Sequence, residues 1–109
     1  MPLALLISSH VAASTVGGGV GRFVLNCAGI ETMLVPTVLY GRHPGWGALG
    51  GGAVEADTFQ SMIEAIAAQG ALAQTDLVLT GYFADAGQVM MAAAAIDQVR
   101  QRALADGAA

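Results

Sequence analysis

The chain has 109 residues, of which 55% are hydrophobic and only 11% are charged, and its formal net charge is −4. This length favours a single domain, and four basic residues are too few for the basic patch that nucleic-acid binding requires. Because lysine is absent, a side-chain Schiff base and a Walker-type phosphate-binding lysine are both excluded. The single cysteine excludes an internal disulfide.

Apolar runs in this chain stay well below the roughly 18 residues of a membrane span. The start, Met1-Pro2-Leu3, lacks the positive flank of an export signal. We therefore expect no membrane association and a cytoplasmic location. The low charge content leaves two alternatives open. A partner chain or a missing remainder of the same protein covers part of the surface, or the many alanines are simply exposed to solvent.

The first expected elements are a strand at residues 3–7 and a helix at residues 18–28. An unbroken apolar run is typical of a strand that a parallel sheet buries on both faces, and spacings of three and four are typical of an amphipathic helix. The expected inward stripe of this helix is Val20, Phe23, Val24, Cys27 and Ala28. Residues 31–38 predict a second strand, which Pro36 indicates either lies near a sheet edge or leaves the sheet there.

Residues 41–52 contain six glycines and predict a mobile lid or a tight crossing. Asp57 or Thr58 is expected to cap the next helix. The apolar stripe of that helix, up to Gly70, is Phe59, Met62, Ile63 and Ile66.

Residues 77–81 predict a third buried strand, and residues 86–104 predict a last helix. The expected inward residues of this helix are Val89, Met90, Ala93, Ile96 and Val99. The alternation of strands and helices indicates an α/β fold with a mostly parallel sheet and flanking helices. A ligand site is then expected at the carboxyl edge of the sheet, where Ser9 and Tyr82 follow the first and third strands.

The glycines at 17–21 do not fit the dinucleotide frame G-x-G-x-x-G, because Arg22 occupies its last position. A close backbone approach is the simpler explanation, and an anion at the helix N-terminus stays open. His10 and His43 are too few for a metal site. We expect His10 to be a buried histidine bonded to backbone, and His43 to be either an exposed loop residue or a ligand contact.

Three segments, read together, resemble pyridoxal kinases of the ribokinase-like superfamily. They are Ser9-His10-Val11, the stretch from Val35-Pro36-Thr37-Val38 to His43-x-Gly45-Trp46-Gly47, and Asp76-x-Val78-Leu79-Thr80-Gly81-Tyr82. The resemblance covers almost the whole chain. Each motif is weak alone, and their combination is fairly specific. The resemblance implies a ribokinase-like (Rossmann-like) fold with a lid, in which residues 1–109 form the amino-terminal, substrate-binding part of the domain.

Such kinases transfer the γ-phosphoryl group of ATP to the 5′-hydroxymethyl group of pyridoxal, pyridoxine or pyridoxamine. By matching motif positions, Ser9 is expected to bond the pyridine ring, His43 to close the lid and Tyr82 to flank the ring. The expected apolar walls are Val16, Val38 and Tyr40. The chain departs from the family pattern at Gly18 and at Gly41-Arg42.

ATP and Mg²⁺ are implied for the whole kinase, but the G-x-G-D segment with the catalytic aspartate does not occur in this sequence. We therefore expect no catalytic residue and no metal ligand here, no cofactor bound by this chain alone, and no activity without a partner. The expected partners are a pyridoxal-type molecule and either a carboxyl-terminal kinase half or a second copy. Two alternatives stay open: a non-catalytic dimerisation or interaction module derived from this fold, and a generic nucleotide-binding domain.

Overall fold

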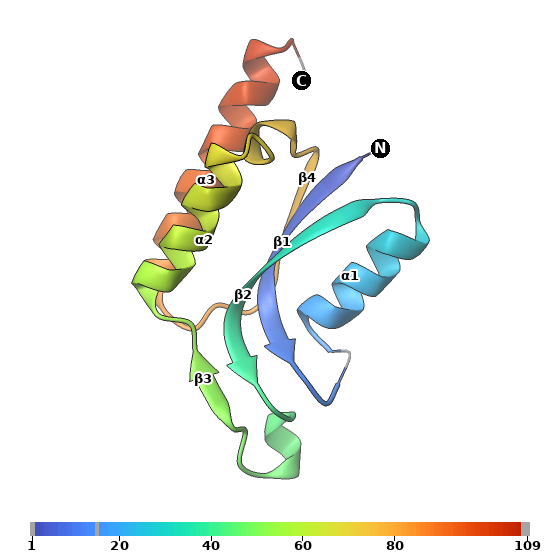
Figure 1. Ribbon diagram of the computed structural model, residues 1–109, viewed down its shortest axis with the longest axis vertical. Coiled ribbons are helices and arrows are strands. Elements are labelled where there is room, and N and C mark those ends of the chain that lie inside the picture. The colour runs from blue at the N-terminus through green and yellow to red at the C-terminus, as the bar shows by residue number, and fades with distance from the viewer. Residues whose placement is uncertain (1, 15, 108–109) are drawn as a thin grey trace.

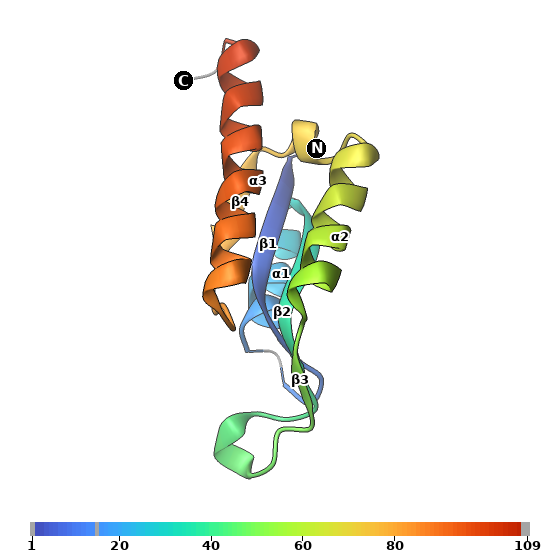
Figure 2. The same cartoon turned by 90° about the vertical axis from the view of Figure 1, so that its left-hand side faces the viewer.

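The computed structural model describes residues 2–14 and 16–107, which form a sheet with helices on both faces (Figures 1 and 2). The helices and strands are β1 (Leu3–Val11), α1 (Gly18–Cys27), β2 (Glu31–Tyr40), β3 (Gly51–Ala53), α2 (Ala56–Ala68), β4 (Leu77–Thr80) and α3 (Ala86–Ala105), with short 3₁₀ helices at Pro44–Trp46 and Leu72–Gln74. The sheet order is β3-β2-β1-β4. β1 is parallel to β2 and β4, and β3 is antiparallel to β2. The predicted mostly parallel α/β architecture is confirmed.

Strand β1 is the centre of the molecule. Its residues Ala4 to Ile7 are at most 1% exposed. Leu5 and Ile7 join the core that α2 and α3 cover, whereas Leu6 faces α1, as the alternation of a strand requires. The prediction of a first strand buried on both faces is correct.

Helix α2 covers the sheet with the predicted stripe, in which Phe59 and Ile63 are buried and Met62 and Ile66 are partly buried. Its N-cap is Glu55, which makes no side-chain capping bond, so the expected cap at Asp57 or Thr58 is wrong. None of the described helices is long and apolar enough to cross a membrane.

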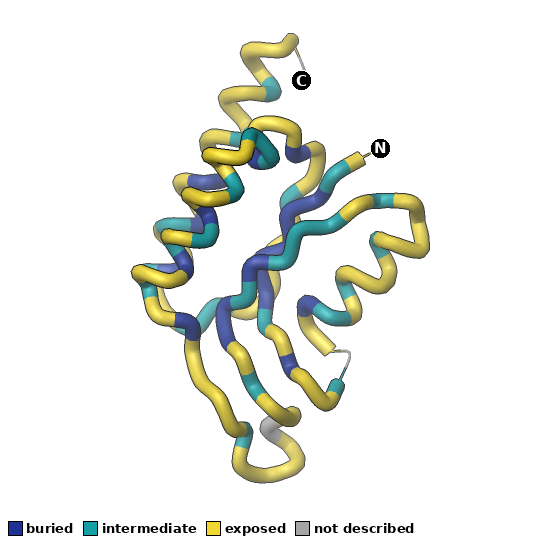
Figure 3. Tube along the Cα trace, in the orientation of Figure 1, coloured by how far each residue is buried: buried dark blue, intermediate teal, exposed yellow. Residues whose placement is uncertain are grey.

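Helix α1 packs on the sheet with a face different from the predicted one. Gly18 is buried, and a Cβ there would lie 2.7 Å from Leu34 Cδ1. A Cβ at Gly21 would lie 3.1 Å from Leu6 Cδ2. Glycine lets the helix backbone approach the strands this closely. The expected stripe therefore faces solvent (Figure 3), with Phe23 66% and Val24 58% exposed.

Cys27 belongs to this outer face and is exposed, so its expected burial is wrong. On the same side of the molecule, β4 is an edge strand and is also less covered than predicted. Leu77 and Leu79 are both exposed, because α1 packs mainly on β1 and β2 and leaves this face of β4 largely uncovered.

Helix α3 begins as predicted and ends one residue later, but only part of its predicted inward face is buried. Met90 is 74% exposed, and Val89 and Ala93 are exposed as well. Ile96 is partly buried, and Val99 packs against the core as predicted. The buried residues are Gln88, Ala92 and Ala95. The apolar pattern does not predict this face, because its first buried residue, Gln88, is polar.

The strand β3 was not predicted, since residues 51–53 carry no side-chain pattern, and the sequence indicated only a loop there. β3 pairs only with residues 38–40 of β2. β2 therefore lies one place in from the edge of the sheet, and β3 does not extend far enough to pair with it at Pro36. The strand continues past the proline to Tyr40, so Pro36 lies near an edge and β2 does not leave the sheet there.

Replacing Gly18 with alanine tests the close packing of α1. The added Cβ meets Leu34 Cδ1 at 2.7 Å and the Ser9 carbonyl oxygen at 2.8 Å, so Gly18→Ala should lower the free energy of unfolding by about 1–3 kcal/mol. Urea denaturation followed by circular dichroism measures the change. The matched control is Gly19→Ala, whose Cβ makes only an ordinary contact at 3.8 Å. Equal stability of the two variants would contradict the packing of α1.

Candidate functional site

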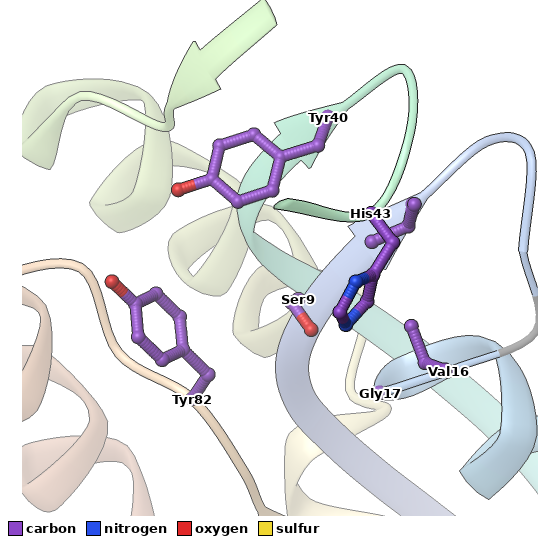
Figure 4. A pocket seen from close by; sticks show the side chains of 7 residues that line it. Ser9, Val16, Gly17, Tyr40, His43 and Tyr82 are labelled. Carbon is purple, nitrogen blue, oxygen red and sulfur yellow. The ribbon is translucent and has the colours of Figure 1, made fainter. Parts of the chain in front are cut away.

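A cavity of about 320 Å³ lies beyond the end of β4, at the carboxyl edge of the sheet (Figure 4). Its lining residues are Ser9, Val11, Val16, Gly17, Tyr40, His43 and Tyr82. Five of the six residues proposed from the sequence are among them. They come from three separate parts of the chain, which meet here because the parallel strands β1, β2 and β4 end at the same edge.

Val38, the sixth predicted residue, is completely buried and does not line the cavity. A β-bulge accounts for the local arrangement. Ser8 pairs with Pro36 and His10 pairs with Leu39, so two residues of β2 lie opposite Ser9 alone.

The bulge changes which residues of β2 share a face with β1. Before it, the odd-numbered Val35 pairs with Ile7, and beyond it the even-numbered Tyr40 pairs with Val11. Paired residues of parallel strands share a face, so the extra residue places Tyr40 beside Val11 at the cavity. Simple alternation along the sequence does not reveal this change.

Ser9 occupies a space that depends on Gly17. Gly17 is the N-cap of α1 and has φ = 62°, a conformation that side chains disfavour. A Cβ at this position would collide with Ser9 Oγ. The expectation that the glycine cluster provides a close backbone approach is confirmed here. Val11 and Gly17 are the two lining residues that the sequence did not predict.

Tyr82 is held by the backbone of the loop that precedes α3. The Gly81 N–H donates to the Ile7 carbonyl at 2.8 Å, and the Thr37 hydroxyl donates to the Tyr82 carbonyl at 2.7 Å. A Cβ at Gly81 would collide with Ser8 Oγ, so glycine is required there. The Tyr82 side chain itself is 55% exposed, and in Figure 4 its ring lies across the cavity from Val16, with Ser9 between them.

His43 reaches the cavity from the loop between β2 and β3, which Figure 2 shows extending away from the helices. Its Nδ1 accepts a hydrogen bond of 3.0 Å from the Gly45 N–H. In a neutral imidazole, an accepting Nδ1 leaves the proton on Nε2. His43 can therefore act as a donor to a bound molecule.

His10 is exposed, so its expected burial is wrong. In the part of the chain that the structure describes, no three histidine, cysteine, aspartate or glutamate side chains are grouped so that they could hold a metal ion.

An apolar cavity with a few polar groups, at the carboxyl edge of a mostly parallel sheet, is typical of an α/β domain that binds a small molecule. No protein-family model matches the chain. The chain is 36% identical to pyridoxal kinase PdxY of Deinococcus radiodurans over 97 residues. The matched region covers 89% of this chain and 33% of the relative. The chain is 33% identical to pyridoxal kinase PdxY of Paraburkholderia phymatum, over 88% of this chain and 32% of the relative.

The solved structures that resemble this chain include pyridoxal kinases as well. The pyridoxal kinase of Leishmania donovani, in complex with ADP and pyridoxamine, matches 97% of this chain and 37% of its own length, with a TM-score of 0.90 and 27% identity. The resemblance to pyridoxal kinases is confirmed, and the fold is that of part of a ribokinase-like domain. The chain spans about a third of the length of the curated relatives that it matches.

Replacing Gly51 with alanine tests how β3 holds the base of the lid. Gly51 has φ = 71°, and a Cβ there would collide with the Leu39 carbonyl. Gly51→Ala should separate β3 from β2 and increase trypsin cleavage after the exposed Arg42 by about tenfold, because cleavage follows local opening. Mass spectrometry of a trypsin time course measures it. Gly52→Ala is the control, since its Cβ meets nothing within 4 Å. Equal cleavage of both variants would contradict this role.

Proposed function

We propose that this chain is the acceptor-binding part of a pyridoxal kinase-like protein, and that its cavity binds a vitamer such as pyridoxal. The observation that carries the proposal is that Ser9, His43 and Tyr82, each from a different matched segment, line one cavity. Solved pyridoxal kinases of Leishmania donovani contain pyridoxamine or pyridoxine together with ADP. A cytoplasmic location is part of the same proposal.

The chemistry of the lining suits a flat heteroaromatic molecule. Val11 and Val16 offer apolar surface, and the rings of Tyr40 and Tyr82 offer faces on which a pyridine ring can stack. The Ser9 hydroxyl can donate to or accept from a polar substituent of that ring, and His43 can donate from its Nε2. A volume of about 320 Å³ is at the lower end of small-molecule sites.

Phosphoryl transfer requires a metal ion, groups that stabilise the transferred charge and a residue that orients the nucleophile. The residues that line the cavity include no aspartate or glutamate, and Mg²⁺ is usually held by carboxylate oxygens, so this lining does not fit Mg²⁺ and we derive no step through ATP or metal here. In this proposal, the present chain binds and orients the vitamer. A complementing kinase segment supplies the ATP site and the catalytic base.

The side of the molecule formed by α1 and β4 is the proposed contact surface for that segment. It carries the exposed apolar side chains of Val20, Phe23, Val24, Leu77 and Leu79. β4 is also an outer strand, whose free edge can pair with a further strand. The matched relatives are about three times as long as this chain, so their remaining length has to pack somewhere. An apolar face beside an open edge is a suitable place.

Ser9→Ala tests vitamer binding. Removing one hydrogen bond to the ring should raise the Kd for pyridoxal about 3- to 10-fold, a cost of roughly 0.5–1.5 kcal/mol. Titration of the chain with pyridoxal, followed by its absorbance and by competition with pyridoxine, measures the change. Absence of lysine simplifies the titration, because no side-chain amine captures the aldehyde.

The matched control is Ser61→Ala, on the exposed face of α2 and away from the cavity. It should bind pyridoxal as the unaltered chain does. If the unaltered chain does not bind pyridoxal at millimolar concentration, or if both serine variants lose affinity equally, the proposed site is wrong.

Phe23→Asp tests the contact surface. Mixed with ATP, Mg²⁺ and the remaining two thirds of the Deinococcus radiodurans kinase, the unaltered chain should support pyridoxal phosphorylation, whereas alone it should not. Burying an aspartate in an apolar contact costs several kcal/mol, so Phe23→Asp should reduce the rate at least tenfold. The control is Met90→Asp, an equally exposed apolar residue on α3, over the other face of the sheet.

The positive reference is the amino-terminal third of the Deinococcus radiodurans kinase itself. If that third restores activity and the present chain does not, the complementation proposal fails. A stable dimer that Phe23→Asp dissociates, without any phosphorylation, would favour the interaction-module alternative. Sedimentation of the chain alone decides that point.

A further inference from the structure

The completely buried Gln88 is the most unusual feature of the core that the cavity does not explain. Its side chain is 0% exposed, although glutamine is mostly found on protein surfaces. It lies near the start of α3, where its own N–H donates to the capping carboxylate of Asp85 at 2.8 Å. A buried amide is tolerated only when its polar atoms are bonded.

The amide of Gln88 joins three segments of the chain. Its Nε2 donates to the Thr37 carbonyl at 2.9 Å and to the Val54 carbonyl at 2.8 Å. Its Oε1 accepts from the Ala84 N–H at 2.9 Å. Both donor hydrogens of the amide are therefore used, and each bond ends on backbone rather than on another side chain.

Thr37 extends this network to the wall of the cavity. It is completely buried, and its hydroxyl donates to the Tyr82 carbonyl at 2.7 Å. The loop that carries Tyr82 is thus held at two points. The Tyr82 carbonyl is bonded to Thr37 of β2, and the Ala84 N–H is bonded to the Gln88 side chain. Val54 follows β3 directly, at the base of the lid that carries His43, and its N–H donates to the Thr37 carbonyl at 2.9 Å.

We propose that Gln88 and Thr37 are positioning residues that fix the Tyr82 loop and the base of the lid relative to each other. Neither lines the cavity. Because Tyr82 is more than half exposed, its own packing holds it weakly, and these backbone attachments set where its ring lies. This inference rests on the proposed function only for its effect on vitamer affinity, and its effect on Tyr82 is independent of any ligand.

Thr37→Val and Thr37→Ser test the inference, because valine matches the shape of threonine without the hydroxyl, and serine keeps the hydroxyl. Thr37→Val should raise the Kd for pyridoxal about 3- to 10-fold, because a Tyr82 loop that is no longer fixed has to be ordered when the ligand binds, and Thr37→Ser should restore the affinity. The matched control is Thr75→Val. It also removes a hydroxyl of a buried threonine that donates to a backbone carbonyl, that of Ala71 at 3.0 Å, but it lies outside the cavity lining.

A second measurement needs no ligand. The chain has two tyrosines, so incorporation of 3-fluorotyrosine gives two fluorine NMR signals, which Tyr82→Phe assigns. In Thr37→Val and in Gln88→Met the Tyr82 signal should shift or broaden while the Tyr40 signal stays in place. Thr75→Val should change neither signal.

The outcomes separate the two proposals. If Thr75→Val weakens pyridoxal binding as much as Thr37→Val does, or if the Tyr82 signal is unchanged in folded Thr37→Val, the positioning role is wrong. If pyridoxal does not bind at all but the Tyr82 signal responds as expected, the positioning role stands and the proposed function fails. Should Gln88→Met not fold, the Thr37 pair still decides the matter.

Discussion

The burial of β1 on both faces and along both edges is the constraint on which the remaining structure depends. Residues Ala4 to Ile7 are almost completely buried, so the polar side chains of this strand begin after Ile7. The neighbouring strands β2 and β4 run parallel to β1. The carboxyl ends of all three strands therefore bring Ser9, Tyr40 and Tyr82 together at the cavity. The cavity therefore lies just beyond the apolar part of β1, where these side chains meet.

The cavity is shaped more by backbone than by the side chains that line it. Gly17 and Gly81 leave room for Ser9 and Ser8, and the bulge in β2 turns Tyr40 toward Val11. These constraints act through steric exclusion and register, which tolerate few substitutions.

Apart from β3, the order of strands and helices was predictable from the sequence, because buried apolar runs and the stripe of α2 are strong local signals. The packing faces of α1 and α3 were not. Helix α1 packs on the sheet through Gly18 and Gly21, and glycines contribute nothing to an apolar pattern. The buried face of α3 begins with Gln88, which is polar. Ser9 and Tyr82 of the candidate site were predictable from the strand ends, which converge at one edge of a parallel sheet. The other candidate residues came from the resemblance alone, and of these Val38 is buried and does not line the cavity.

The extra residue of the bulge in β2 also sets what kinds of evolutionary change this region can accept. The loop at residues 41–50 can gain or lose residues at small entropic cost, since closing a somewhat longer loop adds only about 0.6 kcal/mol for each doubling of length. Between Val35 and Tyr40 even a single insertion or deletion matters, because it would move every following side chain of β2 to the opposite face of the sheet. Length variation among relatives should therefore collect in the lid and be absent from the five-residue step that precedes it.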